Sequence, residues 1–404
     1  MIRTATTILT VALLLAASST GLADNGLKEG PVELKSAGPL AFGPSGILFV
    51  GDAKGAAIVA IDTGDVGGDA STAKDNVEKL GDKVAAMLGT KADQIQIVNI
   101  AANPVNGNVY LSVARGRGPS AIPVILRVTS AGKIEELKLD KVKHAKATLP
   151  NAPEDKVTGE GRRAANNREF SITDLSFMEN QVIVAGLTNE EFSSNLRAIP
   201  FPFKDVNDGS AIEIYHGAHG KLETHSPVRT FVPINFGSEP QIIAAYTCTP
   251  LVRIPLSELK PGKKVRGTTV AELGNRNRPL DIIAYSKGGK HYLLMANSAR
   301  GVMKIGTDKL DMKEGINERI SGTAGQGYDT VSELTDVTQL DKLNDTHAVL
   351  LIEKDGGAEL KTIALPGCGG ASDDDDNTHH AGALTRAGVF LFGGQITCVE
   401  HFSS

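Results

Sequence analysis

Short apolar runs, separated by Gly, Asn or Lys turn residues, recur along most of the chain at intervals of about 45 to 75 residues. Each unit begins with an apolar run, passes through a turn and continues into a second and a third run, as antiparallel β-strands do. Seven units follow this order, at residues 39–62, 99–128, 174–201, 227–256, 279–305, 336–365 and 381–402. Several are followed by a fourth run, as at 133–139 and 264–273. Four-strand repeats of this kind predict an all-β fold, the β-propeller.

The repeat count predicts seven blades, with six as the alternative because the unit at 336–365 lacks a clear fourth run. The last unit ends at its third run, and residues 31–36 resemble the missing fourth strand. We therefore expect this N-terminal strand to join the last blade and close the ring. A two-sheet sandwich, or two smaller all-β domains, is the alternative architecture. Insertions at 71–90 and 141–168 interrupt the repeats; the first ends in a short amphipathic helix and the second reads as a surface loop.

The first residues have the pattern of a secretory signal peptide. Arg3 is followed by an apolar run at 8–17 and by small residues that allow cleavage after Ala23. This run is about half as long as a membrane-spanning helix, and no later stretch is long and apolar enough to cross a bilayer. We therefore expect residues 1–23 to be removed, residues 24–404 to form one propeller domain, and the protein to be periplasmic or extracellular.

Composition limits the kinds of partner that the protein can have and the ways in which its cysteines can pair. The chain is 41% hydrophobic, which excludes a disordered protein, and its net charge of −5 argues against nucleic acid as the main partner. It has three cysteines, Cys248, Cys368 and Cys398. In an exported protein Cys368 and Cys398 are the expected disulfide pair, and three unpaired thiols are the alternative.

The candidate binding residues lie in loops that a propeller gathers on one face. These are the loops that lead into the innermost strands and those that join the second and third strands, at the mouth of the central channel. The polar residues at these positions are Asn99, Asp174, His225, Asn277, Arg278, Asn297, Arg300, Asp336 and His380. Asp174, Asp336 and His380 are candidate ligands for a divalent metal, calcium or zinc. Because loops on any fold are polar, ordinary solvent-exposed loops are the alternative explanation.

Two denser clusters also have metal-binding residue types. Four consecutive aspartates, 373–376, precede His379 and His380 and follow Cys368, but their spacing matches no known calcium loop. The second cluster has His216 and His219 three residues apart, with Glu223 and His225 nearby, and a turn could bring these imidazoles together on a transition metal. A solvated acidic loop and exposed turn histidines are the respective alternatives. The chain has no G-x-S-x-G nucleophile motif, and none of its glycine-rich turns precedes a helix as a phosphate-binding loop does.

The unit at 43–62 resembles propellers of the NHL and gluconolactonase (senescence-marker) type, in which a similar glycine-turn-strand phrase marks each blade. Longer phrases, at 197–204, 213–220, 245–253, 272–281 and 294–305, are similar to those of a family of uncharacterised exported bacterial propellers. The second resemblance covers nearly the whole mature chain but brings no established activity.

The gluconolactonase resemblance implies a divalent metal in the channel, held by a first-blade Glu together with Asn and Asp residues. Asn99, Asp174, Asn277 and Asp336 match the Asn and Asp ligands, whereas Gly38 and Pro39 stand where the Glu is expected. We therefore expect a ligand-binding or scaffold module for a small molecule or another exported protein. The alternative is a metal-dependent lactonase or hydrolase at the channel mouth, in which the metal activates water and a channel Asp acts as base. The sequence shows no recognisable catalytic motif and leaves enzymatic activity open.

Overall fold

The computed structural model describes residues 26–161, 164–236, 239–248 and 250–367. The chain divides into two units, residues 1–368 and 369–404. The predicted signal peptide, the seventh repeat at 381–402, His380 and the Cys368–Cys398 pair lie outside the described residues.

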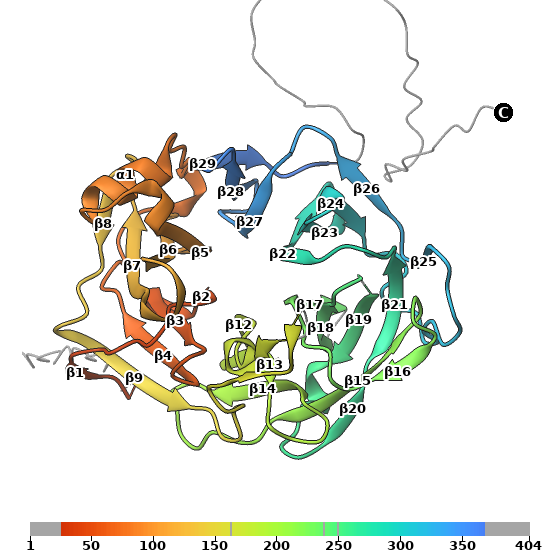
Figure 1. The fold of residues 1–404 in the computed structure, drawn as a ribbon. Helices are drawn as coiled ribbons and strands as arrows, with labels where there is room; N and C mark the ends of the chain where they lie inside the picture. The colour runs from red at the N-terminus through yellow and green to blue at the C-terminus, as the bar shows by residue number, and fades with distance from the viewer. Residues whose placement is uncertain (1–25, 162–163, 237–238, 249, 368–404) are drawn as a thin grey trace, which may run out of the picture. The chain divides into compact units, whose positions relative to one another are not determined.

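Most of the described part of the chain forms six sheets with mainly antiparallel pairing, here called blades 1 to 6 in sequence order (Figure 1). From the innermost strand outward, blade 1 contains β2 (Leu40–Phe42), β3 (Ile47–Asp52), β4 (Ala57–Asp62), β9 (Val142–Thr148) and β1 (Lys28–Gly30). Blade 2 contains β5 (Ile95–Ala102), β6 (Val109–Arg115), β7 (Ile122–Val128) and β8 (Ile134–Glu136). Blade 3 contains β12 (Asp174–Met178), β13 (Gln181–Leu187), β14 (Ser194–Pro200) and β15 (Ser210–His216), and β15 also pairs with β16 (Lys221–Glu223) and β20 (Lys264–Arg266).

The remaining blades follow the same order. Blade 4 contains β17 (Thr230–Phe236), β18 (Glu239–Ala245), β19 (Pro250–Pro255), β21 (Thr268–Leu273) and β25 (Thr323–Gly325). Blade 5 contains β22 (Pro279–Lys287), β23 (Lys290–Asn297), β24 (Gly301–Gly306) and β26 (Tyr328–Val331), and blade 6 contains β27 (Val337–Lys342), β28 (His347–Lys354) and β29 (Gly357–Ala364). Outside the blades lie helix α1 (Leu80–Met87) and the small hairpin of β10 (Val157–Thr158) and β11 (Ala165–Asn166). No helix in the described ranges is long and apolar enough to cross a membrane.

Burial explains why the second strand of each repeat is its most apolar run. Every residue of β3 is buried, because neighbouring blades cover both of its faces. Near the edge of blade 3, β15 instead alternates strictly between buried and half-buried residues. The apolar second runs therefore correspond to strands enclosed between two blades.

Six hydrophobic clusters join the blades into a closed ring. Each cluster combines side chains of two neighbouring blades: 1 with 3, 3 with 4, 4 with 5, 5 with 6, 6 with 2, and 2 with 1. The fold is therefore a six-bladed β-propeller, the alternative that the sequence left open beside seven. Blade 6 packs directly on blade 2, so the six blades of the described residues form a closed ring.

The spatial order of the blades differs from their order in the sequence. Blade 2 lies between blades 1 and 6, and Figure 1 shows its orange and yellow strands between the red and blue ones. The reason is that β9 pairs with β4, although all of blade 2 lies between them in the sequence. Blade 2 is thus a complete blade inserted between two neighbouring strands of blade 1.

This insertion changes how the ring closes. The predicted closing segment, 31–36, stays with blade 1, because the Lys35 and Ser36 N–H groups donate to the Asp52 carboxylate of β3 at 3.0 and 2.8 Å. Just before this segment, β1 pairs with β9. The prediction that this segment joins the last blade is wrong, because β9 offers its free edge to the N-terminal chain. Residues 141–168, expected as a loop, likewise begin with the strand β9.

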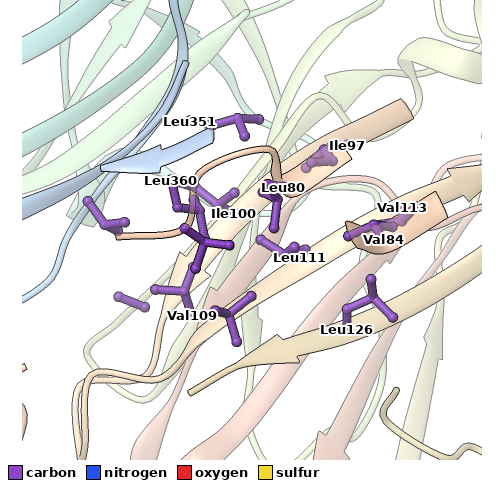
Figure 2. Close-up of a cluster of buried hydrophobic side chains, with 14 of the residues drawn as sticks. Leu80, Val84, Ile97, Ile100, Val109, Leu111, Val113, Leu126, Leu351 and Leu360 are labelled. Carbon is purple, nitrogen blue, oxygen red and sulfur yellow. The ribbon is translucent and has the colours of Figure 1, made fainter. Parts of the chain in front are cut away.

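The insertion at 71–90 closes the ring on blade 6. Val77 forms an antiparallel bridge with Leu360 of β29, and the Asp75 N–H donates to Thr362 Oγ1 at 2.7 Å. Helix α1, predicted from its apolar spacing, buries Leu80 and Val84 in the same cluster as Leu360 (Figure 2). Contacts between an internal segment and a strand far along the sequence therefore close the ring in place of a terminal strand.

Candidate functional site

Six equivalent positions, one on each blade, line the central channel. Each comes directly before a buried apolar residue of the innermost strand, and all six border the same cavity. We call them the channel ring: Pro39, Asn99, Asp174, Thr230, Asp281 and Gln339. In blades 2, 5 and 6 the pairing of the innermost strand shifts by one residue just before the ring position, at 97/99, 279/281 and 337/339. Such bulges redirect a side chain, and here they precede Asn99, Asp281 and Gln339.

Three channel-ring side chains join their blade to the next one. Asp174 Oδ2 accepts hydrogen bonds from the Phe231 N–H and from Thr230 Oγ1, each at 2.8 Å. Asp281 Oδ2 accepts from the Leu340 N–H at 3.0 Å, and Asn99 Oδ1 from the Leu40 N–H at 2.9 Å. These bonds link blades 3 to 4, 5 to 6 and 2 to 1, in the same direction around the ring.

Two further contacts strengthen the junction of blades 6 and 2. Asp341 Oδ2 accepts from the Ala102 N–H at 2.7 Å. The Asn99 side-chain amide donates to Gln339 Oε1. Asp341 also lines a second, smaller cavity of the channel.

Burial keeps these channel carboxyls from ionising normally. It raises the pKa of Asp174 to about 7 and that of Asp341 to about 6, against the hydrogen bonds that each receives. Burial, and then the neighbouring charge of Asp174, raise the pKa of Asp281 well above its usual value. These carboxyls therefore titrate closer to neutral pH than ordinary aspartates do, and the charge of Asp174 affects the titration of Asp281.

Two cavities meet at the channel ring. The larger, about 420 Å³, opens toward Lys35, Lys54 and Arg229, and the smaller, about 290 Å³, extends to the other side and includes Asp341 and Lys342. Asn99, Asp174 and Asp281 border both cavities. A cavity of the larger size is within the usual range for small-molecule sites.

The mouth of the larger cavity carries an excess of positive charge. Arg229 Nε donates to Thr247 Oγ1 at 3.1 Å, and its guanidinium lies 5.1 Å from the centre of the Phe170 ring. Burial, and then the charge of Arg278, lower the pKa of Arg229, which nevertheless remains a cation at neutral pH. Against Lys35, Lys54 and Arg229, the acidic side chain at this mouth is Glu169. The site therefore favours an anionic group at its outer end.

The structure brings two of the predicted residues, Asn99 and Asp174, into the channel. The other described candidates do not border either cavity. Asn297 Nδ2 donates to Asn277 Oδ1 at 2.9 Å within a buried turn, and the Asp336 carbonyl accepts from the Glu353 N–H in a turn of positive φ. His225 is exposed, and its Nδ1 lies 3.4 Å from Ser193 Oγ.

The two predicted arginines, Arg278 and Arg300, lie outside the lining of both cavities. The exposed Arg278 interacts through its backbone N–H with Ser298 Oγ, and Arg300 Nη2 donates to the Asn275 carbonyl at 3.1 Å. Sequence reasoning missed Asp281 and Gln339 and selected neighbours three or four positions away. The six ring residues share one local feature, because each directly precedes a buried apolar residue of the innermost strand.

Metal-binding side chains come together elsewhere. In the described part of the chain, the one group of His, Cys, Asp and Glu residues close enough to hold a metal is His216, His219 and Glu223. Asp174 and Asp336 belong to no such group, and the predicted set that includes His380 stays a prediction. Cys248 is a free thiol.

No known protein family matches the chain, and no curated protein does. Among solved structures, an aldose sugar dehydrogenase from Streptomyces coelicolor with bound PQQ is 13% identical, with a TM-score of 0.30, over 83% of this chain and 97% of that one. An oxidoreductase (glucose dehydrogenase) from Thermus thermophilus is 12% identical, with a TM-score of 0.32, over 84% of this chain and 100% of that one. A streptogramin B lyase is 12% identical, with a TM-score of 0.25, over 84% and 97% of the two chains. Similarity this low does not bear on function.

Proposed function

We propose that the protein is an exported β-propeller that binds a small anionic molecule rich in hydroxyl groups, in the channel cavity. The observation that carries this proposal is the combination of a cavity of about 420 Å³ with Lys35, Lys54 and Arg229 at its mouth. The pattern of the first 23 residues supports export. The carboxyl groups of the channel ring suit a ligand with hydroxyl groups, because a protonated carboxyl donates a hydrogen bond to a hydroxyl and an ionised carboxyl accepts one from it.

The outer and inner parts of the cavity differ in charge and should therefore contact different groups of the ligand. Cations at the outer end would pair with a carboxylate or phosphate of the ligand. Deeper in the cavity, Asp174 and Asp281 repel a second anion when they are ionised, so the inner part of the ligand should be neutral and polar. Sugar acids and polyol acids have this asymmetry, and they are the ligand class that we favour over another exported protein.

A metal-dependent lactonase or hydrolase is the second candidate, and one observation favours it. Asp174 has a pKa of about 7 and borders the cavity, so it could accept and return a proton at neutral pH. Two observations count against it. The blade 1 position of the channel ring is Pro39, and the described channel carboxyls form no metal-binding group.

Calorimetric titration of the mature protein tests the binding proposal. Gluconate and glucuronate should bind, whereas glucose should bind at least about tenfold more weakly because it lacks the charged group. Arg229→Gln and Lys54→Met should each weaken binding of the acids. Lys290→Met, at an exposed position of β23, is the matched control and should leave binding unchanged. Equal binding of acids and glucose, or no effect of Arg229→Gln, would contradict the proposal.

The hydrolase alternative has its own readout. Lactone turnover that requires an added divalent metal and disappears in Asp174→Asn would support it. Binding of sugar acids without turnover, in the presence of calcium or zinc, would leave the binding module as the better account.

A further inference from the structure

A compact cluster of two histidines and a glutamate lies on the hairpin of β15 and β16, away from both channel cavities. His216 ends β15, His219 lies in the turn, and Glu223 ends β16. The turn is fixed by its own backbone, because the His219 and Gly220 N–H groups donate to the His216 carbonyl at 3.1 and 2.8 Å. This local geometry brings residues three and seven positions apart to one place.

The three side chains already face one another. His216 Nδ1 lies 3.0 Å from Glu223 Oε2, and His219 Nδ1 lies 2.6 Å from Glu223 Oε1. The two imidazole ring centres are 3.8 Å apart. One ligand atom from each of the three residues lies within 4.8 Å of the others. Little movement is needed for all three to reach a common point.

Burial distinguishes this cluster from a polar surface turn. His216 continues the inward-facing row of Ile212 and Ile214 and is only 2% exposed, at a position that would suit an apolar residue. Its Nε2 has no hydrogen-bond partner among the described residues. A buried polar atom without a partner is costly, so its presence in this row indicates a role other than packing.

A second carboxylate, from blade 4, lies directly beneath the turn. Glu272 of β21 is fully buried, and its Oε1 accepts a hydrogen bond from the Gly217 N–H. Its Oε2 has no partner within the described ranges. The half-buried Glu223 and the buried Glu272 thus place two carboxyl groups near the two imidazoles, and a cation bound there would offset their negative charge.

We propose that His216, His219 and Glu223 bind one divalent transition-metal ion, with zinc as the preferred metal. Imidazole nitrogen and carboxylate oxygen are common zinc ligands, and they bind at about 2.0 to 2.2 Å. Two nitrogen ligands disfavour calcium and magnesium, which prefer oxygen. The side chain of His219 is 46% exposed, which gives the ion a route from solvent and leaves room for a water ligand. All three ligands lie on the hairpin of blade 3, and the site does not depend on what the channel binds.

A metal-free explanation also exists and must be separated by experiment. Glu223 could simply accept hydrogen bonds from both imidazoles and from Ser226 Oγ at 3.0 Å, with Lys221 Nζ 3.9 Å away. In that case the cluster would stabilise the hairpin without a preference for any metal. The two explanations differ in stoichiometric metal binding and in the effect of replacing His219.

The experiment uses the mature full-length protein, stripped of metal with a chelator and titrated with ZnCl₂ and, for its visible spectrum, with CoCl₂. We expect one ion per chain, a spectrum typical of nitrogen and oxygen ligands, and a rise in melting temperature with zinc. His219→Ala, at the more exposed ligand, should weaken binding at least about tenfold while the protein stays folded. His216→Gln should do the same, with circular dichroism checking its fold.

Two controls make the assignment specific. His225→Ala removes an exposed histidine close in sequence but outside the cluster, and it should retain the ion. A His379→Ala, His380→Ala double variant removes the other histidine pair of the sequence and should also retain it. The absence of stoichiometric zinc binding, its persistence in His219→Ala, or its loss in the double variant would each overturn the proposal.

Discussion

Asp174 on the innermost strand of blade 3 accepts a hydrogen bond from the backbone N–H of Phe231 on the innermost strand of blade 4, at 2.8 Å. The same relationship joins Asp281 to Leu340 and Asn99 to Leu40, so it links alternate pairs of blades around the channel. Three residues that line the cavity thus also link neighbouring blades. Ligand binding and stability are therefore coupled at these positions.

Replacing Asp174 tests whether its hydrogen bonds stabilise the junction of blades 3 and 4. Asp174→Ala removes the acceptor of the Phe231 N–H and of Thr230 Oγ1, and a buried donor without a partner costs about 1–3 kcal/mol. We expect the free energy of unfolding in urea to fall by about this amount, and by less in Asp174→Asn, which keeps one acceptor oxygen. Asp345→Ala, at a carboxylate whose side chain is 95% exposed, is the control. An Asp174→Ala protein as stable as the control would show that the bond does not hold the blades.

The raised carboxyl pKa values predict an unusual pH dependence. The pKa of Asp174, about 7, and that of Asp341, about 6, lie above the ordinary value near 3.9, so the folded state binds more protons than the unfolded state between these limits. The free energy of unfolding should therefore fall as the pH rises from about 4 to about 7. Urea titrations at several pH values measure this slope, and the double variant Asp174→Asn, Asp341→Asn should flatten it. An unchanged slope in the double variant would assign the effect to other groups.

Ring closure can be tested on helix α1. Leu80 is fully buried in the cluster between blades 2 and 6, whereas Met87 of the same helix is 39% exposed. Leu80→Ala should lower the free energy of unfolding by about 2–5 kcal/mol, because it leaves a cavity at the closure. Met87→Ala should change it by less than about 1 kcal/mol. Similar losses in the two variants would contradict the role of this cluster in closing the ring.

Removing a negative charge at the mouth should tighten the binding of an anionic ligand, whereas removing a positive charge should weaken it. Glu169 lines the larger cavity together with Lys35, Lys54 and Arg229. Glu169→Gln should tighten the binding of a sugar acid a few-fold at low ionic strength, and the gain should fade at high salt because of screening. Calorimetry at two salt concentrations measures both effects. Weaker binding in this variant would mean that Glu169 contacts the ligand directly.

The sequence predicts the local architecture of this protein better than its global order. Runs such as that of β3 are apolar because a neighbouring blade covers each face, so the six described repeats could be located from their pattern alone. The position of blade 2 could not be predicted. It depends on the pairing of β4 with β9 across the whole of that blade, and no local pattern in Val142–Thr148 indicates its partner.

The candidate site shows the same limit at smaller scale. The sequence predicts Asn99 and Asp174 as site residues because they begin apolar runs. In the unit that contains Asp281, it predicts Asn277 and Arg278 instead, four and three residues upstream. A bulge at 279/281 sets which side chain of that strand comes next to the channel, and bulges depend on tertiary pairing. The histidine cluster was suggested by its spacing, whereas the contribution of Glu272 needs the contact of β21 with the turn.

The most direct test of the binding account is a crystal structure of the mature protein soaked with glucuronate. The account predicts density for the sugar acid in the larger cavity, with its carboxylate within hydrogen-bond distance of Arg229 or Lys54 and its hydroxyl groups near Asp174 and Asp281. An empty cavity at saturating ligand, or a ligand with its carboxylate turned toward the channel ring, would contradict it.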